Sequence, residues 1–93
     1  MEVTNNKKLS RFDILLPDGE FAVLEYRWLK GAMVFMHTMV PVAARGHGLA
    51  DKLAKFALDY VREQGLKVII YCPFVTKYME KHPEYIDLLE VTK

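Results

Sequence analysis

Apolar and polar residues alternate through the first third of the chain, and this period of two predicts half-buried β-strands. The apolar positions of one face are Phe12, Ile14 and Leu16 in residues 9–16, and Ala22, Leu24, Tyr26 and Trp28 in residues 20–30. Pro17-Asp18-Gly19 separates the two runs and is a turn signal, because proline presets φ, aspartate bonds its own backbone and glycine accepts positive φ. We therefore predict a β-hairpin, preceded by a flexible polar tail over residues 1–6.

The remaining two thirds of the chain contain segments with other patterns. Residues 32–40 are mostly apolar on both faces, which is typical of a central strand covered on two sides. An amphipathic helix follows, and Gly65 is placed as its C-terminal cap. Its apolar face is formed by Ala50, Leu53, Ala54, Ala57, Leu58 and Val61. Residues 67–72 predict another strand, and residues 73–82 and 85–89 predict short helical pieces.

The order of these elements predicts the fold class. A strand, a helix and a second strand in succession form a right-handed crossover in which the two strands are parallel. We expect an α/β fold with a mixed (α+β) sheet, in which antiparallel strands precede a β-α-β crossover with a parallel strand pair. Short C-terminal helices complete it. The 93 residues are expected to form one domain, 1–93.

Composition narrows the class of protein. Hydrophobic residues make up 52% of the chain and charged residues 27%, as in a globular protein. A net charge of +1 argues against nucleic acid as a partner, because nucleic-acid binders normally carry a basic excess. The longest apolar run is far too short to span a membrane. The single cysteine rules out an internal disulfide and favours a reducing, cytoplasmic setting. No metal site is predicted.

The stretch from Val40 to Lys52 is the strongest candidate for a binding site. The apolar run ends at Val40, the helical pattern begins by Leu49 or Ala50, and Arg45-Gly46-His47-Gly48 lies between them. The free N–H groups in the first turn of a helix, together with the helix dipole, bind phosphate groups. Glycines let the backbone approach the anion closely. The alternative is a plain connection between a strand and a helix.

A second group of candidates lies at the carboxyl ends of the two parallel strands. These positions are His37, Thr38 and Met39 on the first strand and Cys72 on the second. Ligands of such sheets bind outside the carboxyl ends of the strands, beside a helix N-terminus. We therefore expect these side chains to line the same cleft as the glycine loop.

These segments resemble a known family. Residues 45–50, Arg45-Gly46-His47-Gly48-Leu49-Ala50, match the Arg/Gln-x-x-Gly-x-Gly/Ala signature of the GNAT acetyltransferases, whose loop holds the pyrophosphate of acetyl-CoA. Further matching segments are His37-Thr38-Met39-Val40-Pro41, Gly65-Leu66-Lys67-Val68, Cys72-Pro73-Phe74-Val75 and Lys81-His82-Pro83-Glu84-Tyr85. From Tyr26 to the end, the chain is similar to the compact single-domain branch of the GNAT superfamily.

The resemblance implies a site for acetyl-CoA or coenzyme A where the strands 32–40 and 67–72 splay apart. The cofactor-binding residues that it implies are Val40, Arg45, Gly46, His47, Gly48, Leu49, Ala50, Cys72, Phe74 and Tyr78. Arg45 is expected at a phosphate, with a solvated surface arginine as the alternative. His47 occupies a variable position of the motif and is expected to be exposed, with a contact to a CoA phosphate as the alternative.

Three residues are candidates for catalysis, and each has a structural alternative. His37 accepts a proton or is a hydrogen-bonded core histidine. Cys72 acts as a thiolate base, takes the acetyl group, or is a small buried hydrophobe. Tyr78 protonates the departing thiolate, positions its sulfur, or packs in the core. The branch that this chain resembles usually has glutamate where Met39 stands, so the natural general base for attack by an amine is missing.

Two function classes follow. The first is an acetyl-CoA-dependent N-acetyltransferase that moves an acetyl group to an amine, on a small molecule or a protein, which the sequence does not identify. The second is a CoA-binding or protein-interaction module that has lost turnover. So short a chain has no second domain to build an acceptor pocket. An open cleft, a protein amine or the partner subunit of a homodimer would each complete the site.

Overall fold

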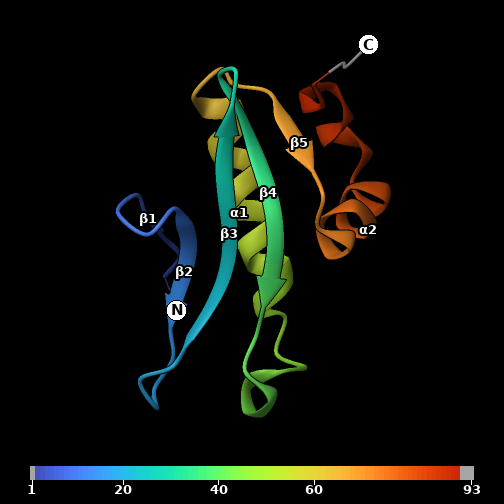
Figure 1. Ribbon diagram of the computed structural model, residues 1–93. Coiled ribbons are helices and arrows are strands. Elements are labelled where there is room, and N and C mark those ends of the chain that lie inside the picture. Colours follow the sequence, from blue (N-terminus) through green and yellow to red (C-terminus); the bar gives the residue numbers. More distant parts are fainter. Residues whose placement is uncertain (1, 91–93) are drawn as a thin grey trace.

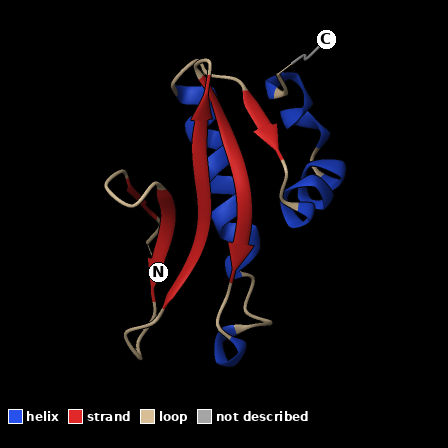
Figure 2. Cartoon of the chain, in the orientation of Figure 1, coloured by secondary structure: helices blue, strands red, loops and turns tan. Residues whose placement is uncertain are grey.

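In the computed structural model, which describes residues 2–90, five strands form one sheet in the order β1-β2-β3-β4-β5. The strands are β1 (Thr4–Asn6), β2 (Arg11–Leu15), β3 (Phe21–Leu29), β4 (Ala32–Met39) and β5 (Val68–Ile70). The helices are α1 (Leu49–Glu63), α2 (Pro73–Lys81) and two 3₁₀-helices, η1 (Val42–Ala44) and η2 (Pro83–Leu88). Strands are antiparallel up to β4, and β4 and β5 are parallel because α1 crosses between them (Figures 1 and 2). The predicted fold class is confirmed.

The helix α1 packs on one face of the sheet, while no helix within residues 2–90 covers the opposite face of β3 and β4 (Figure 1). Side chains buried between α1 and the sheet include Leu53, Leu58, Val61, Phe12, Leu24 and Phe35. Gly65 ends the helix with φ 68°, and the N–H of Leu66 donates to the carbonyl of Val61 at 2.9 Å. This is the hydrogen bond of a Schellman cap, so the predicted cap is confirmed. No helix within residues 2–90 is long and apolar enough to cross a membrane.

A β-bulge changes the course of β4. Glu25 of β3 pairs with His37, but the next residue, Tyr26, pairs with Phe35, so Met36 has no partner. An unpaired extra residue reverses the alternation of side chains on the strand that contains it. His37 therefore leaves the α1 face, to which Phe35 belongs, and lies on the open face. The expectation that residues 32–40 are covered on both sides is wrong for this end of the strand.

The N-terminal segment is ordered where the pattern predicted a flexible tail over residues 1–6. Thr4–Asn6 form β1, which pairs with β2, and Met1 lies outside the described residues. Polar side chains stabilise this pairing. The Tyr26 hydroxyl donates to Asn5 Oδ1 at 2.7 Å, and Asn6 Nδ2 donates to Asp13 Oδ2 at 3.3 Å. A hydrophobic pattern does not record such contacts, and the prediction of a flexible tail is wrong for Thr4–Asn6.

Candidate functional site

The strands β4 and β5 separate near the middle of β4, which leaves a gap at one edge of the sheet (Figure 1). They pair only from Met33 to Phe35 on the β4 side, and the last hydrogen bond runs from the N–H of Tyr71 to the carbonyl of Phe35 at 2.9 Å. Beyond that point β3 is the only strand in the described part of the chain that pairs with β4. Its backbone groups on the other edge are therefore available to a ligand.

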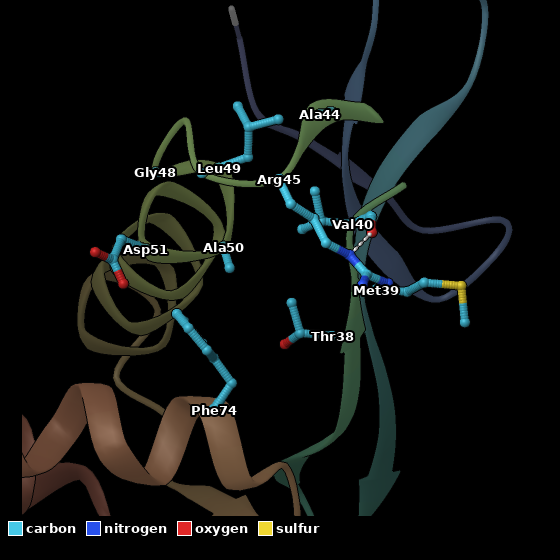
Figure 3. Close-up of a pocket in the computed structure, with 11 residues that line it drawn as sticks. Thr38, Met39, Val40, Ala44, Arg45, Gly48, Leu49, Ala50, Asp51 and Phe74 are labelled. Carbon is cyan, nitrogen blue, oxygen red and sulfur yellow. Dashed lines mark hydrogen bonds between the residues drawn. The ribbon is translucent and has the colours of Figure 1, made fainter. Parts of the chain in front are cut away.

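A cavity of about 560 Å³ lies at this gap (Figure 3). It is lined by Thr38, Met39, Val40, Ala44, Arg45, Gly46, Gly48, Leu49, Ala50, Asp51 and Phe74. Successive side chains of a strand point to opposite faces of the sheet. A cavity that contacts both Thr38 and Met39 therefore extends around the free edge of β4, from the α1 face to the open face.

The glycine loop and the N-terminus of α1 form one wall of this cavity. Gly46 and Gly48 have φ values of 85° and 74°, in the left-handed region that favours glycine. The first hydrogen bond of α1 runs from the N–H of Lys52 to the carbonyl of Gly48 at 3.0 Å. Within residues 2–90, the N–H groups of Leu49 to Asp51 have no acceptor. Such N–H groups, at the positive end of the helix dipole, bind an anion well.

Arg45 brings a positive charge to the same wall. Its Nε donates to the carbonyl of Val40 at 3.0 Å, which holds the guanidinium against the end of β4 (Figure 3). The other guanidinium nitrogens have no partner within the described residues. Asp51 also lines the cavity, but its carboxylate points away from it (Figure 3). An anion at the loop would therefore meet N–H groups and a guanidinium.

The opposite wall is apolar. Phe74 extends from α2 toward α1, where it faces Ala50 across the cavity (Figure 3). This cavity combines an anion site, apolar side chains and free backbone groups along one strand. Such a combination suits a long molecule with phosphates at one end and amides further along. Coenzyme A has this constitution. The predicted residues Val40, Arg45, Gly46, Gly48, Leu49, Ala50 and Phe74 are brought together here.

Cys72 does not line the cavity directly. The predicted strand 67–72 ends earlier, at Ile70, and Cys72 is the N-terminal cap residue of α2. Its side chain is 2% exposed, and its sulfur lies 3.2 Å from Oγ1 of Thr38. Because Thr38 does line the cavity, the thiol contacts the cavity wall through this one hydroxyl.

His37 lies on the open face, and the alternative of a core histidine is wrong. Its side chain is 54% exposed, and Nε2 is 2.9 Å from Oε1 of Glu25 on β3. This pair could not be predicted from the sequence, because the register between β3 and β4 depends on the bulge. Glu25 is therefore a residue that the sequence interpretation missed.

Tyr78 and His47 also lie outside this cavity. The side chain of Tyr78 is 8% exposed and stacks on the imidazole of His82, with ring centroids 4.2 Å apart. Burial raises the pKa of Tyr78 above its ordinary value of 10.0, which makes it a poorer proton donor at neutral pH. His47 is exposed, as expected, and lines a second cavity of about 520 Å³ on the other side of the loop, together with Lys52 and Asp18.

Comparisons with known proteins agree with this fold. The GCN5-related N-acetyl-transferase family matches residues 11–88 of the chain. Protein NATD1 of Homo sapiens is 42% identical over 94 residues, covering 97% of this chain and 83% of its own. Protein NATD1 of Gallus gallus is 36% identical, covering 97% and 86%. The solution structure of a GCN5-like protein from Staphylococcus aureus superposes with a TM-score of 0.73 and 26% identity, covering 99% of this chain and 90% of that one.

Proposed function

This chain belongs to the GCN5-related N-acetyltransferase family, and we propose that it is an acetyl-CoA-dependent N-acetyltransferase that acts on an amine. The observation that carries this proposal is the cavity at the gap between β4 and β5. There the free N–H groups of α1, the guanidinium of Arg45 and the unpaired edge of β4 face a single channel. The acceptor amine is left open.

Each part of the cavity has a role in holding the acyl donor. The N–H groups at the start of α1 and the guanidinium of Arg45 would bind its pyrophosphate. The free edge of β4 would hydrogen-bond the amides of its pantetheine arm, much as an added strand pairs with a sheet edge. Phe74 and Ala50 would cover the methylene groups of the arm. The bound thioester supplies the acetyl group.

The gap would then position the reacting carbonyl. A pantetheine arm that follows the edge of β4 from the glycine loop would pass Val40 and then reach Met39 and Thr38. Backbone N–H groups at this edge would polarise a thioester carbonyl, because a hydrogen-bond donor stabilises the negative charge that develops on its oxygen. The open face of the sheet gives an amine access to the carbonyl from the side opposite α1.

Calorimetric titration with CoA and acetyl-CoA, followed by turnover assays with a panel of amines, tests this proposal. The panel comprises spermidine, lysine amide and a short peptide with a free N-terminus, and product is measured as CoA thiol and as acetylated amine. Binding with turnover supports an acetyltransferase. Absence of binding by either nucleotide at millimolar concentration would overturn the cofactor site and the proposed activity together.

A CoA-binding module without turnover is the second candidate. Met39 favours it, because this residue lines the cavity and is 58% exposed at the position where the branch that this chain resembles usually has glutamate. The same experiment distinguishes the two, since a module of this kind would bind CoA and acetylate no amine in the panel.

A further inference from the structure

The pair formed by His37 and Glu25 lies beside the gap in the sheet, on its open face. Without the unpaired Met36, His37 would alternate onto the face of Phe35, beneath α1. The bulge instead places the imidazole opposite Glu25, with 2.9 Å between Nε2 and Oε1. The imidazole is in contact with solvent and fixed by a single carboxylate.

The imidazole is not itself part of the cavity lining, but a near neighbour on its strand is. Met39 is two residues further along β4, so its side chain is on the face of His37, and it lines the cavity. Residues two apart on a strand are separated by roughly 7 Å. A group that enters the gap from the open face therefore passes beside the imidazole.

We propose that His37 is the general base of the transferase, that Glu25 positions it, and that the acceptor amine approaches on the open face of the sheet. This assignment rests on the proposed function above. Nε2–H of the neutral imidazole donates to the carboxylate of Glu25, which leaves the lone pair of Nδ1 to accept a proton. A carboxylate that fixes the tautomer of a histidine also stabilises the imidazolium that forms.

The proton balance of the step is complete. The amine nitrogen forms a C–N bond with the carbonyl carbon of the thioester, the C–S bond breaks with its electron pair on sulfur, and CoA leaves as the thiolate. The proton lost by nitrogen goes to Nδ1 of His37. The products are the acetylated amine, the CoA thiolate and an imidazolium paired with Glu25, and transfer of the proton to the thiolate or to solvent regenerates the base.

The charges around the imidazole support this assignment. On β2, Arg11 is already bound to Asp13, with Nε 2.9 Å from Oδ2. On β3, Arg27 donates to the carbonyl of Tyr26 at 2.8 Å. The strand β5 contributes no titratable side chain. The carboxylate of Glu25 is thus the charge nearest the imidazole, and Arg11 is its cross-strand partner on β2.

The other candidate bases are less suitable. The thiol of Cys72 is 2% exposed and bound to Thr38, so an amine on the open face does not reach it. Met39 has no group that accepts a proton. His82 forms a similar pair with Glu84, with Nδ1 3.6 Å from Oε2, but it follows the end of α2 and, unlike His37, has no near neighbour in the sequence that lines the cavity. It serves as a matched control.

The first test compares His37→Ala, Glu25→Gln and His82→Gln by kcat/KM for the amine panel against pH. We expect His37→Ala to lose about 10²- to 10⁴-fold near neutral pH, with an unchanged dissociation constant for CoA. Its remaining rate should rise with pH as the amine deprotonates unaided. Added imidazole should restore part of the loss, because the open face admits it. Glu25→Gln should lose less, and His82→Gln should behave as the parent.

The second test needs no acceptor. Nitrogen NMR of the imidazole distinguishes a ring protonated on Nε2 from one protonated on Nδ1. We expect Nε2–H for neutral His37 in the parent and a mixture of tautomers in Glu25→Gln. His37 is exposed and Glu25 is partly exposed, and unchanged thermal melting of the variants would show that the fold is retained.

The results separate this inference from the proposed function. A His37→Ala protein as active as the parent, a parent whose neutral His37 is protonated on Nδ1, or a parent that binds acetyl-CoA and acetylates no amine in the panel would each overturn the role of the pair. Failure to bind CoA would instead overturn the proposed function.

Discussion

The two glycines at the ends of α1 allow a matched test of the anion site. Gly48 precedes the helix with φ 74°, and Gly65 follows it with φ 68°. At both positions an added Cβ meets no atom within 4 Å. Alanine in this left-handed conformation costs about 1–2 kcal/mol, so Gly48→Ala and Gly65→Ala should lower the stability of the free protein by similar amounts. Of the two glycines, only Gly48 lines the cavity, so only its added methyl group would stand beside a bound anion.

The expected shift in Tm on adding CoA follows from the binding equilibrium. A ligand at about a hundred times its dissociation constant adds about 2.7 kcal/mol to the free energy of unfolding. Each kcal/mol moves the Tm of a domain of this size by about 4–8 °C. The parent and Gly65→Ala should therefore gain on the order of 10 °C or more with CoA. Every tenfold loss of affinity removes about 1.4 kcal/mol, so Gly48→Ala should lose half of the gain or more.

Differential scanning fluorimetry, with and without CoA, measures both quantities in one experiment. The apo Tm of each variant gives the backbone cost, and the shift with ligand gives the change in affinity. If Gly48→Ala gained as much as the parent, the phosphate would not lie at this loop. If Gly65→Ala lost its shift equally, the effect would come from the helix as a whole, and the loop would have no special role.

Three further predictions concern single residues. Cys72 should react slowly with N-ethylmaleimide in native buffer and fast in denaturant, because its side chain is 2% exposed; equal rates would place the thiol at the surface. Met39→Glu should restore the neutral-pH turnover of His37→Ala, because both residues lie on the open face; no recovery in kcat/KM would mean that the new carboxylate does not reach the amine. Hydrogen bonds from Arg62 hold the pKa of Asp87 below its ordinary value of 3.8, so the pair stabilises the fold above that value and the gain is lost as the pH falls through the lowered pKa. Asp87→Asn should thus lower the Tm at neutral pH in low salt, and its Tm should decrease less than that of the parent as the pH is lowered. Equal decreases in the two proteins would contradict this.

The sequence predicted the elements whose apolar side chains build the core. The alternation of Phe12 and Ile14 and the apolar stripe of α1 reflect burial on one face, and burial is what periodicity records. The glycine loop was also predictable, because Gly46 and Gly48 have the positive φ values that few other residues adopt. The strand β1 was missed because its pairing is stabilised by asparagine side chains.

The site was predicted less completely than the fold. The bulge at Met36 consists of one extra residue with no distinctive composition, yet it decides the face on which His37 lies. The partner of His37 could not be found without the register, so Glu25 was missed. Cys72 was expected in the cleft because it stands at the end of a predicted strand. The strand ends two residues earlier, and the buried side chain of Cys72 contacts the hydroxyl of Thr38.

The two faces of the sheet would have different tasks in the proposed reaction. The donor would be held on the α1 side, where the helix N-terminus supplies N–H groups and Phe74 supplies apolar surface. The acceptor would arrive on the open face, where β3 and β4 present the pair of Glu25 and His37 to solvent. Because the described part of the chain covers only one face of the sheet, no wall would surround the acceptor there, and the geometry of the gap would select it. The size of the molecule that carries the amine is then not limited by this chain, and a protein amine fits the open face as readily as a small one.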